Sequence, residues 1–316
     1  MKNNQTKNCL FTIPAARFKL VFIAEKKYQF YGKEPVIRSK IGYNLKRVCC
    51  NYQDFNIRSC DNCELITNCM YIKLFSPVYK KTLDNDKESQ IKTSIRPFVI
   101  ALKTMDKFYN MNKDDKGIIY FTFFGPAIKN FGYYFESIHA LESLFPINII
   151  SLERLIPDID NALIDENQTA WPLNNWSLKY FNKTIQNVNI HFMTPVSFKM
   201  KNKITKNNIT YTLIIKSIIR RLRDLKRVFD NDDNMGNIDS IIEESNKIQV
   251  ITNNLHWSKR KRYSFYQDQD VFLNGFSGNI SFYGNIAESL PYLKAAEIIN
   301  IGKSTSAGNG RIICDI

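Results

Sequence analysis

The order of the predicted elements predicts an α+β fold of two tandem ferredoxin-like (RRM-like) domains with a C-terminal glycine-rich loop. Three observations support this fold in the 316-residue chain. The first half reads strand, helix, strand, strand, helix, strand, which is the order of a ferredoxin-like unit. A second alternating strand and a strongly amphipathic helix follow, and the chain closes with a helix, the loop and a strand. No exact internal repeat accompanies this order.

The first domain is expected over residues 1–170, with a cysteine-rich insertion at 49–69. Its first strand begins an alternating stretch at residues 16–30. A helix follows, because apolar residues recur at helical spacing and Pro35 suits a helix start. The remaining elements are a strand at 95–102, a polar hairpin loop at 104–116, a strand at 117–124, a helix at 125–144 and a strand at 147–155.

The second domain is expected over residues 187–316, after a linker at 171–186 that lacks a clear period. It opens with the alternating strand "VNIHFMTPVSFKM". The segment "TLIIKSIIRRLRDLKRVFD" predicts a helix with an apolar stripe on one side and basic residues on the other. Extended segments with glycine turns lead to a short helix at 288–301 and a closing strand at 311–316.

The chain is strongly basic. It has 44 Lys and Arg against 30 Asp and Glu, a net charge of +14, with a pI near 9.3. Such an excess is typical of proteins that bind a polyanion, because neutralising phosphates releases counterions. A lineage rich in lysine and asparagine would produce the same excess without any such partner.

The sequence also predicts a soluble, cytoplasmic protein without a membrane partner. The first twenty residues contain no long apolar stretch, so no secretory signal is expected. The longest apolar stretch covers residues 117–128, well short of the roughly 20 residues that a membrane-spanning helix needs.

Five of the seven cysteines fall between residues 49 and 69. In a cytosolic chain this clustering favours metal binding over disulfides. One C-x-x-C with flanking cysteines supplies four thiolates for a structural zinc ion, with Cys49 to spare. The spacing is irregular, however, and free buried cysteines or an iron–sulfur site are the alternatives. The predicted zinc ligands are Cys50, Cys60, Cys63 and Cys69.

Three glycines, a lysine and several hydroxyl residues crowd into "GKSTSAGNG" before the last strand. Such a loop can direct several backbone N–H groups at one anion. It is not a P-loop, because it lacks the upstream spacing and precedes a strand where a P-loop opens a helix. A tight turn that closes the last hairpin is the structural alternative.

The segments around this loop resemble a known family. "RYSFYQ…FLNGFSGNISFYGNI…LPYLKAAEIINIGKSTSAGNGRI" is similar to the C-terminal signature of the CRISPR-associated RAMP-superfamily endoribonucleases that process precursor crRNA, the Cas-six family. "VIRSKIGYNLKRVCC…CDNCELITNCMYIKLF", "YFTFFGPAI" and "FMTPVSFK" resemble its patterns further upstream. Ser39 and Asn309 depart from them, at positions where the family usually has glycine and an aromatic residue or leucine.

The resemblance implies cleavage of CRISPR repeat RNA without a catalytic metal. The 2′-hydroxyl attacks the adjacent phosphate and leaves a 2′,3′-cyclic phosphate and a 5′-hydroxyl. If no histidine is catalytic, we expect a slow, single-turnover enzyme that retains its crRNA product. Such a site needs a base, a donor for the leaving oxygen and positive charge at the phosphorane. A non-catalytic RAMP subunit, which binds crRNA with other CRISPR effector subunits, is the rival interpretation.

Many relatives carry a histidine near the first helix, whereas the three histidines of this chain lie elsewhere. Tyr43 occupies the corresponding helix, and its alternative is a half-buried structural tyrosine. His256 precedes a basic run and is the candidate base, or else a surface histidine. His139 fits a helix-packing role better, and His191 alternates within a probable strand. The candidate catalytic residues are Tyr43, His256, Lys303 and His139.

The basic helix and the loop are the expected RNA contacts. A solvated face is the alternative for any single arginine of that helix, but the group sits in a strongly basic chain. A folded repeat would be recognised mainly through its shape and backbone. The candidate RNA-binding residues are Arg38, Lys46, Arg220, Arg221, Arg223, Arg262, Ser264, Lys303, Ser304, Thr305 and Arg311.

Overall fold

The structure is a computed structural model of the 316-residue chain. It describes residues 12–30, 32–52, 54, 60, 63–81, 90–103, 110–157, 170–177, 185–200, 203–206, 208–229, 238–264 and 269–316.

The N-terminal sheet is fully antiparallel, with the strand order β4-β5-β1-β6. Apolar residues alternate along its central strand, so that Leu20 and Phe22 are buried. A short strand, β7 (Trp171–Pro172), pairs with the start of β1. The four main strands are β1 (Pro14–Ala24), β4 (Phe98–Leu102), β5 (Lys116–Phe124) and β6 (Ile147–Leu155).

Helices pack on this sheet, and α1 does so through part of its apolar residues at helical spacing, because Val36 and Val48 are exposed. In α1, Ile37, Ile41 and Leu45 are buried, and a proline occupies the first turn. The segment expected as one helix at 125–144 forms two, because the chain leaves helical geometry at Asn130, whose side chain donates to the Pro126 carbonyl. The helices are α1 (Glu34–Cys49), α2 (Met70–Phe75), α3 (Pro126–Lys129) and α4 (Phe131–His139).

The C-terminal sheet repeats this plan, with the strand order β11-β15-β8-β16. In its central strand β8, Val188, Ile190 and Phe192 are buried and alternate with partly exposed residues. The short strand β12 (His256–Ser258) also pairs with β15. The main strands are β8 (Asn187–Val196), β11 (Gln249–Asn253), β15 (Gly275–Tyr283) and β16 (Ile312–Asp315).

The amphipathic helix α6 lies on this second sheet. Its stripe Ile214, Ile218 and Leu222 is fully buried, as predicted. The described residues of this half form four α-helices, of which α5 contacts α8. They are α5 (Leu173–Ser177), α6 (Tyr211–Phe229), α7 (Asp239–Asn246) and α8 (Leu290–Ile299).

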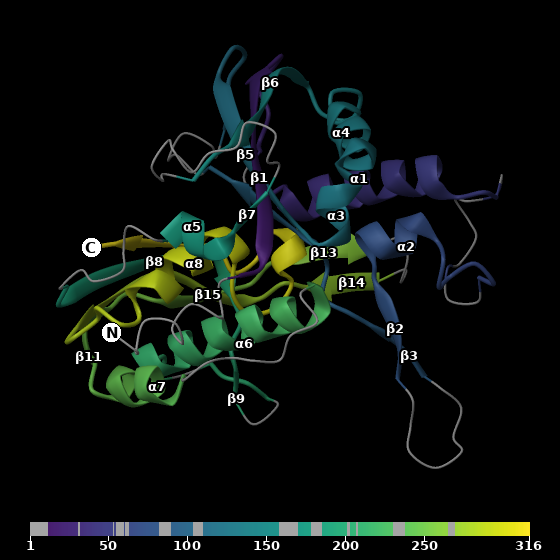
Figure 1. The fold of residues 1–316 in the computed structure, drawn as a ribbon. Helices are drawn as coiled ribbons and strands as arrows, with labels where there is room; N and C mark the ends of the chain where they lie inside the picture. The colour runs from purple at the N-terminus through teal and green to yellow at the C-terminus, as the bar shows by residue number, and fades with distance from the viewer. Residues whose placement is uncertain are drawn as a thin grey trace.

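Three two-stranded hairpins project from these layers (Figure 1). The sequence predicts none of them separately, because their strands are only two to four residues long. They pair β2 (Val78–Lys81) with β3 (Gln90–Thr93), β9 (Lys199–Met200) with β10 (Lys203–Ile204), and β13 (Lys261–Ser264) with β14 (Gln269–Phe272).

Both sheets arrange their first four main strands in the same spatial order, 2-3-1-4. Each has helices after its first and third strands, and this connectivity is ferredoxin-like. The α+β prediction of two tandem ferredoxin-like units is therefore confirmed. The domain limits at residues 170 and 186 stay predictions. None of the helices in the described part of the chain combines the length and apolar character that crossing a bilayer requires.

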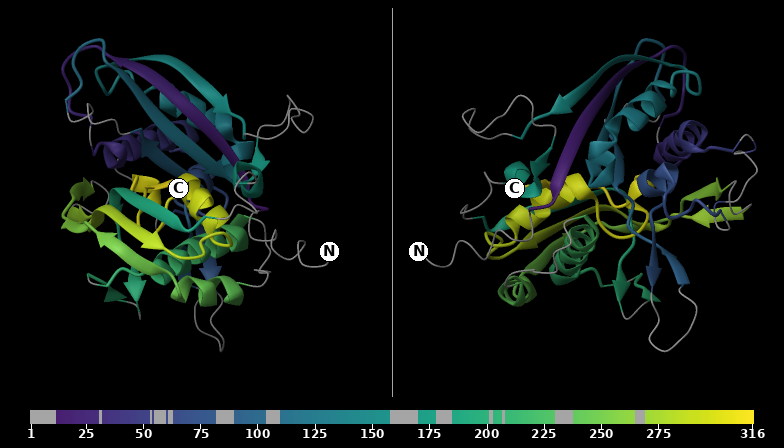
Figure 2. Two further views of the ribbon diagram at one scale, coloured as in Figure 1. Left: turned by 90° about the vertical axis from the view of Figure 1, so that its left-hand side faces the viewer. Right: turned by 45° about the vertical axis from the view of Figure 1, so that its right-hand side comes forward.

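The two halves pack directly against each other. Ile13, Ala15 and Phe124 come from the N-terminal sheet, yet they belong to the same buried cluster as α6, α8 and the C-terminal sheet. In Figures 1 and 2, β1 runs from the N-terminal sheet down to the layer that holds α5 and α8. We call the junction between the two halves the seam, and this apolar contact fixes their relative orientation.

The glycine-containing segment 300–311 connects α8 to β16 and lies partly in the seam. It contains a single 3-10 turn, η5 (Thr305–Ala307), which contacts β4 and α1. Gly302, Gly308 and Gly310 have positive φ angles of 78°, 83° and 80°. Residues 305–311 are buried, whereas Lys303 and Ser304 are exposed.

Gly310 has a positive φ and lies against the Ile301 carbonyl, which an added Cβ would overlap. We therefore expect Gly310→Ala to lower the free energy of unfolding by about 2–3 kcal/mol, measured by urea denaturation. Gly132 on α4 is the matched control, because a Cβ there meets nothing within 4 Å. Gly132→Ala should leave stability unchanged or raise it by up to about 1 kcal/mol. Equal stabilities for the two variants would contradict this account of the segment.

Candidate nucleic-acid interface

Three arginines from distant parts of the chain meet at the seam. Arg38 lies on α1, Arg96 precedes β4 and Arg262 lies in β13. Burial, followed by the charges of Arg96 and Arg262, lowers the pKa of Arg38 to about 9. Burial and the charge of Arg262 lower the pKa of Arg96 as well. We call these three side chains the arginine cluster.

The arginine cluster is poorly neutralised by the protein. The guanidinium carbon of Arg38 lies over the Phe75 ring, 4.5 Å from the ring centre. Among the described residues, the buried Nε atoms of Arg96 and Arg262 have no hydrogen-bond partner. Buried guanidinium groups without partners are unfavourable. A phosphate that reached the cluster would supply both the missing charge and the missing acceptors.

A second pair of arginines lies elsewhere on the seam. The Arg17 guanidinium sits 4.8 Å from the centre of the Tyr120 ring. Burial, then the charge of Arg17, lowers the pKa of Arg311, whereas Glu34 and Glu297 oppose this shift. Arg311 is only 8% exposed, so the seam holds more buried positive charge than its two carboxylates neutralise.

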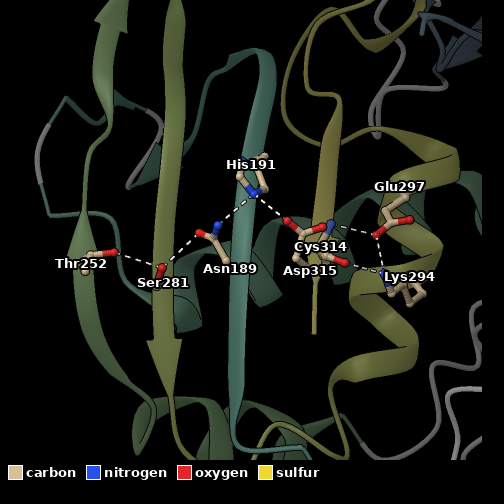
Figure 3. Close-up of polar contacts among 8 residues, drawn as sticks. All are labelled: Asn189, His191, Thr252, Ser281, Lys294, Glu297, Cys314 and Asp315. Atoms are coloured by element: carbon tan, nitrogen blue, oxygen red, sulfur yellow. Dashed lines mark hydrogen bonds and ion pairs between the residues drawn. The ribbon is translucent and has the colours of Figure 1, made fainter. Parts of the chain in front are cut away.

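Both of these carboxylates already have partners. Glu34 accepts a hydrogen bond from Arg260 at 2.7 Å, and the two side chains are 3% and 17% exposed. Glu297 on α8 accepts from the Lys294 ammonium and from the Cys314 N–H, both at 2.8 Å (Figure 3). Neither carboxylate is therefore free to neutralise a further arginine at the seam.

The backbone of the 300–311 segment is largely committed to the protein. The Ala307 and Asn309 N–H groups donate to the Ser304 carbonyl, and the Gly310 N–H donates to the Pro195 carbonyl. These N–H groups are not available to cradle a phosphate, which favours the structural turn for this half of the segment. Its exposed half, Lys303 and Ser304, stays accessible.

The four candidate catalytic residues lie on four different elements. Tyr43 is 48% exposed on α1, and His256 is exposed in β12. Lys303 follows α8. His139 ends α4, where its Nδ1 lies 3.0 Å from the Phe135 carbonyl and its ring contacts the Phe135 ring at a tilt of 41°. That position matches the helix-packing alternative for His139.

His191 lies in a row of polar side chains across the C-terminal sheet (Figure 3). Its Nε2 is 2.8 Å from both the Asn189 amide nitrogen and an Asp315 carboxylate oxygen. The row continues through Ser281 to Thr252, with two hydrogen bonds of 3.0 Å. These contacts link four neighbouring strands, so His191 has a structural role in the sheet.

The predicted RNA-binding residues fall into several places. Arg38 and Arg262 meet in the arginine cluster, while Arg220 and Arg221 share a cavity with Lys303. Arg96 completes the cluster, although the sequence offers no signal for it. Of the remaining candidates, Thr305 and Arg311 are buried, whereas Ser304 and Arg220 are exposed. Arg223 is half-buried on α6, and Lys46 lies near the end of α1. The Ser264 side chain lies outside the described residues.

The clustered cysteines line one cavity of about 360 Å³ at the end of α1. Burial and the neighbouring thiols of Cys69 and Cys50 raise the pKa of Cys49 to about 11. In the described part of the chain, no three Cys, His, Asp or Glu side chains have an arrangement that would hold a metal ion. The zinc site of Cys50, Cys60, Cys63 and Cys69 therefore stays a prediction.

Two models of known families match separate parts of the chain. Residues 12–147 match a family model described as an N-terminal domain. Residues 190–312 match the model of the CRISPR-associated endoribonuclease Cas6. This C-terminal part of the chain is therefore similar to the Cas6 family. No curated protein matches the chain in sequence.

Solved structures with Cas6 in their names share the fold. A chain of a partial Cas6-RT-Cas1–Cas2 complex superposes with a TM-score of 0.58 at 12% identity, covering 96% of this chain and 46% of that one. The chain thus spans under half of that longer protein. Thermus thermophilus Cas6 superposes with a TM-score of 0.51 at 13% identity, covering 96% and 99% of the two chains. A Cas6 product complex gives 0.51 at 15% identity, covering 96% and 100%.

The seam charges lead to a prediction of opposite effects at two arginines. Arg96→Met removes one of three clustered charges, so we expect the free energy of unfolding to stay constant or rise by about 1 kcal/mol while RNA affinity falls. Arg260→Met leaves the buried Glu34 carboxylate without its partner and should cost about 3 kcal/mol. Urea denaturation and RNA titration measure both effects. A large loss of stability in Arg96→Met would contradict the conclusion that the protein leaves the charge of the cluster uncompensated.

Proposed function

We propose that this chain is a metal-independent endoribonuclease that cleaves CRISPR repeat RNA within precursor crRNA and retains the product. The observation that carries the proposal is the arginine cluster, a concentration of partly unpartnered positive charge at the seam of a Cas6-family fold. The net charge of +14 supports an RNA substrate.

The arginine cluster matches the electrostatic demand of the reaction. The 2′-oxygen loses its proton and bonds to phosphorus, the bond from phosphorus to the 5′-oxygen breaks, and that oxygen takes up a proton. Negative charge grows on the non-bridging oxygens along the way. Guanidinium groups fixed beforehand around those oxygens stabilise this charge without reorganisation. In the proposal, Arg38, Arg96 and Arg262 hold the scissile phosphate.

The reaction also needs groups that move protons at the 2′-oxygen and the 5′-oxygen. Tyr43 shares α1 with Arg38, so it is our first candidate for the group that assists proton transfer, and Lys303, His256 and His139 follow. A reaction that relies on positive charge without a histidine base is slow, because a base works best with a pKa near neutrality. We therefore expect single-turnover behaviour.

The placement of the candidate acids and bases on four elements favours a second candidate function. This is a non-catalytic RAMP subunit that binds crRNA in an effector complex. The partners in both cases are CRISPR repeat RNA or crRNA and other CRISPR proteins. The name of the Cas6-RT-Cas1–Cas2 complex supports protein partners of this kind. We place both activities in the cytoplasm.

Purified protein with 5′-labelled CRISPR repeat RNAs in EDTA separates the two functions. We expect cleavage at one site, abolished by a single 2′-deoxy substitution at that site. Arg262→Met should slow cleavage by about 10²–10³-fold. The neighbouring Lys261, which is exposed and paired with Asp270, provides the control Lys261→Met with the wild-type rate. Tight binding without cleavage across several repeats would assign the chain to the non-catalytic class.

A further inference from the structure

A large cavity lies beside α6, apart from the apolar stripe of that helix. Its volume is about 910 Å³. Its lining includes α6, residues next to the β2–β3 hairpin and the exposed Gly302–Lys303 turn. Ser197 and Lys199 also line it, so the cavity brings together four segments that are far apart in the sequence.

The lining of this cavity is strongly basic. Among the described residues it includes one carboxylate, that of Asp224. Burial raises the pKa of Asp224, while the surrounding arginines, Arg221 first, lower it. Burial, then the charge of Lys199, lowers the pKa of Lys303. The cationic residues of the lining are Lys199, Arg220, Arg221, Arg227 and Lys303.

Arg221 distinguishes this cavity from an ordinary basic helix face. It is only 7% exposed, and its Nε and Nη2 atoms have no hydrogen-bond partner among the described residues. A merely solvated arginine would extend into water. A buried guanidinium next to a single carboxylate, with two nitrogens unsatisfied, is costly to the fold. An anion in the cavity would offset that cost.

The cavity adjoins the arginine cluster along the chain. Ser94 and Ile95 line the cavity, and the next residue, Arg96, belongs to the cluster. Adjacent residues are about 3.8 Å apart between Cα atoms. The backbone of residues 94–96 therefore connects the wall of the cavity to the arginine cluster.

We infer that this cavity is a second phosphate-binding site, which holds backbone phosphates of the RNA strand next to the phosphate bound at the arginine cluster. Arg221 is the anchor at its wall, and Lys199, Arg220 and Lys303 are the contacts at its mouth. The inference rests on the proposed function for one point, the path of the RNA from the arginine cluster to the cavity. Recognition is through phosphate charge, so the site has no base preference.

A fluorescein-labelled single-stranded oligouridylate tests the site without knowledge of the repeat sequence. Its dissociation constant is measured against KCl concentration for the wild-type protein, Arg221→Gln and Lys303→Gln. We expect each variant to weaken binding by about fivefold at low salt and to reduce the salt slope by about 0.7. Arg220→Gln replaces Arg221→Gln if that buried position proves necessary for folding, because Arg220 is exposed.

Lys216→Gln is the matched control, since Lys216 is an exposed basic residue of the same helix that does not line the cavity. It should bind within about twofold of the wild type. Unchanged binding in the cavity variants, or an equal loss in Lys216→Gln, would overturn the inference. So would a dependence on Arg221 seen with oligoglutamate but not with RNA, which would point to an acidic protein segment. Absence of repeat cleavage by the wild type would refute the proposed nuclease while leaving this comparison readable.

Discussion

The ion pair between Glu34 and Arg260 is the contact around which the seam is built. Its members are 226 residues apart in the chain, and both side chains are largely buried. Arg260 also donates to the Gly32 carbonyl, and Gly308 packs against the Glu34 side chain. One carboxylate therefore positions the start of α1, the approach to β13 and the turn after α8 relative to one another. The arginine cluster depends on this arrangement, because its members come from the same three regions or their neighbours.

The seam combines two opposing demands. Its apolar contacts, such as those of Ala15 and Phe124 with the second core, stabilise one orientation of the two halves. Its arginines act in the opposite direction, since Arg38, Arg96 and Arg262 repel one another in a partly buried setting. Natural proteins concentrate such unfavourable groups at functional sites and offset their cost elsewhere. The surplus of positive charge is therefore best explained by the binding of a polyanionic ligand, because it does not stabilise the folded chain.

Much of the fold could be predicted from local patterns. The alternation in β1 and β8 and the stripe of α6 are direct consequences of the faces that these elements bury. The strand β11 was missed because all five of its residues are exposed, which leaves no alternation to detect, and α7 precedes it in the same unpredicted region. The break at Asn130 also escaped prediction, because the apolar spacing continues through it.

The candidate site was predictable only in part. Arg38 and Arg262 were identified from motifs, but Arg96 lies in a short connection without periodicity, and its proximity to them is a property of the tertiary structure. For the 300–311 segment, the sequence left two alternatives open, an anion-binding loop and a tight structural turn. Its hydroxyl residues and glycines indicate a turn of special backbone geometry, but they carry no information on burial, which depends on α1 packing against it.

The position of the 300–311 segment has a consequence for biogenesis. On the ribosome, the strands of the N-terminal sheet, ending with β7 at Pro172, emerge long before Arg260 and Gly308. A nascent chain at that stage carries an α1 whose Glu34 has no counter-ion and a face around Ala15 and Phe124 that is open to water. The exposed apolar face would attract chaperones or neighbouring nascent chains until the second half is synthesised. The contacts of the seam are complete only once Gly310, whose N–H donates to the Pro195 carbonyl, has been synthesised.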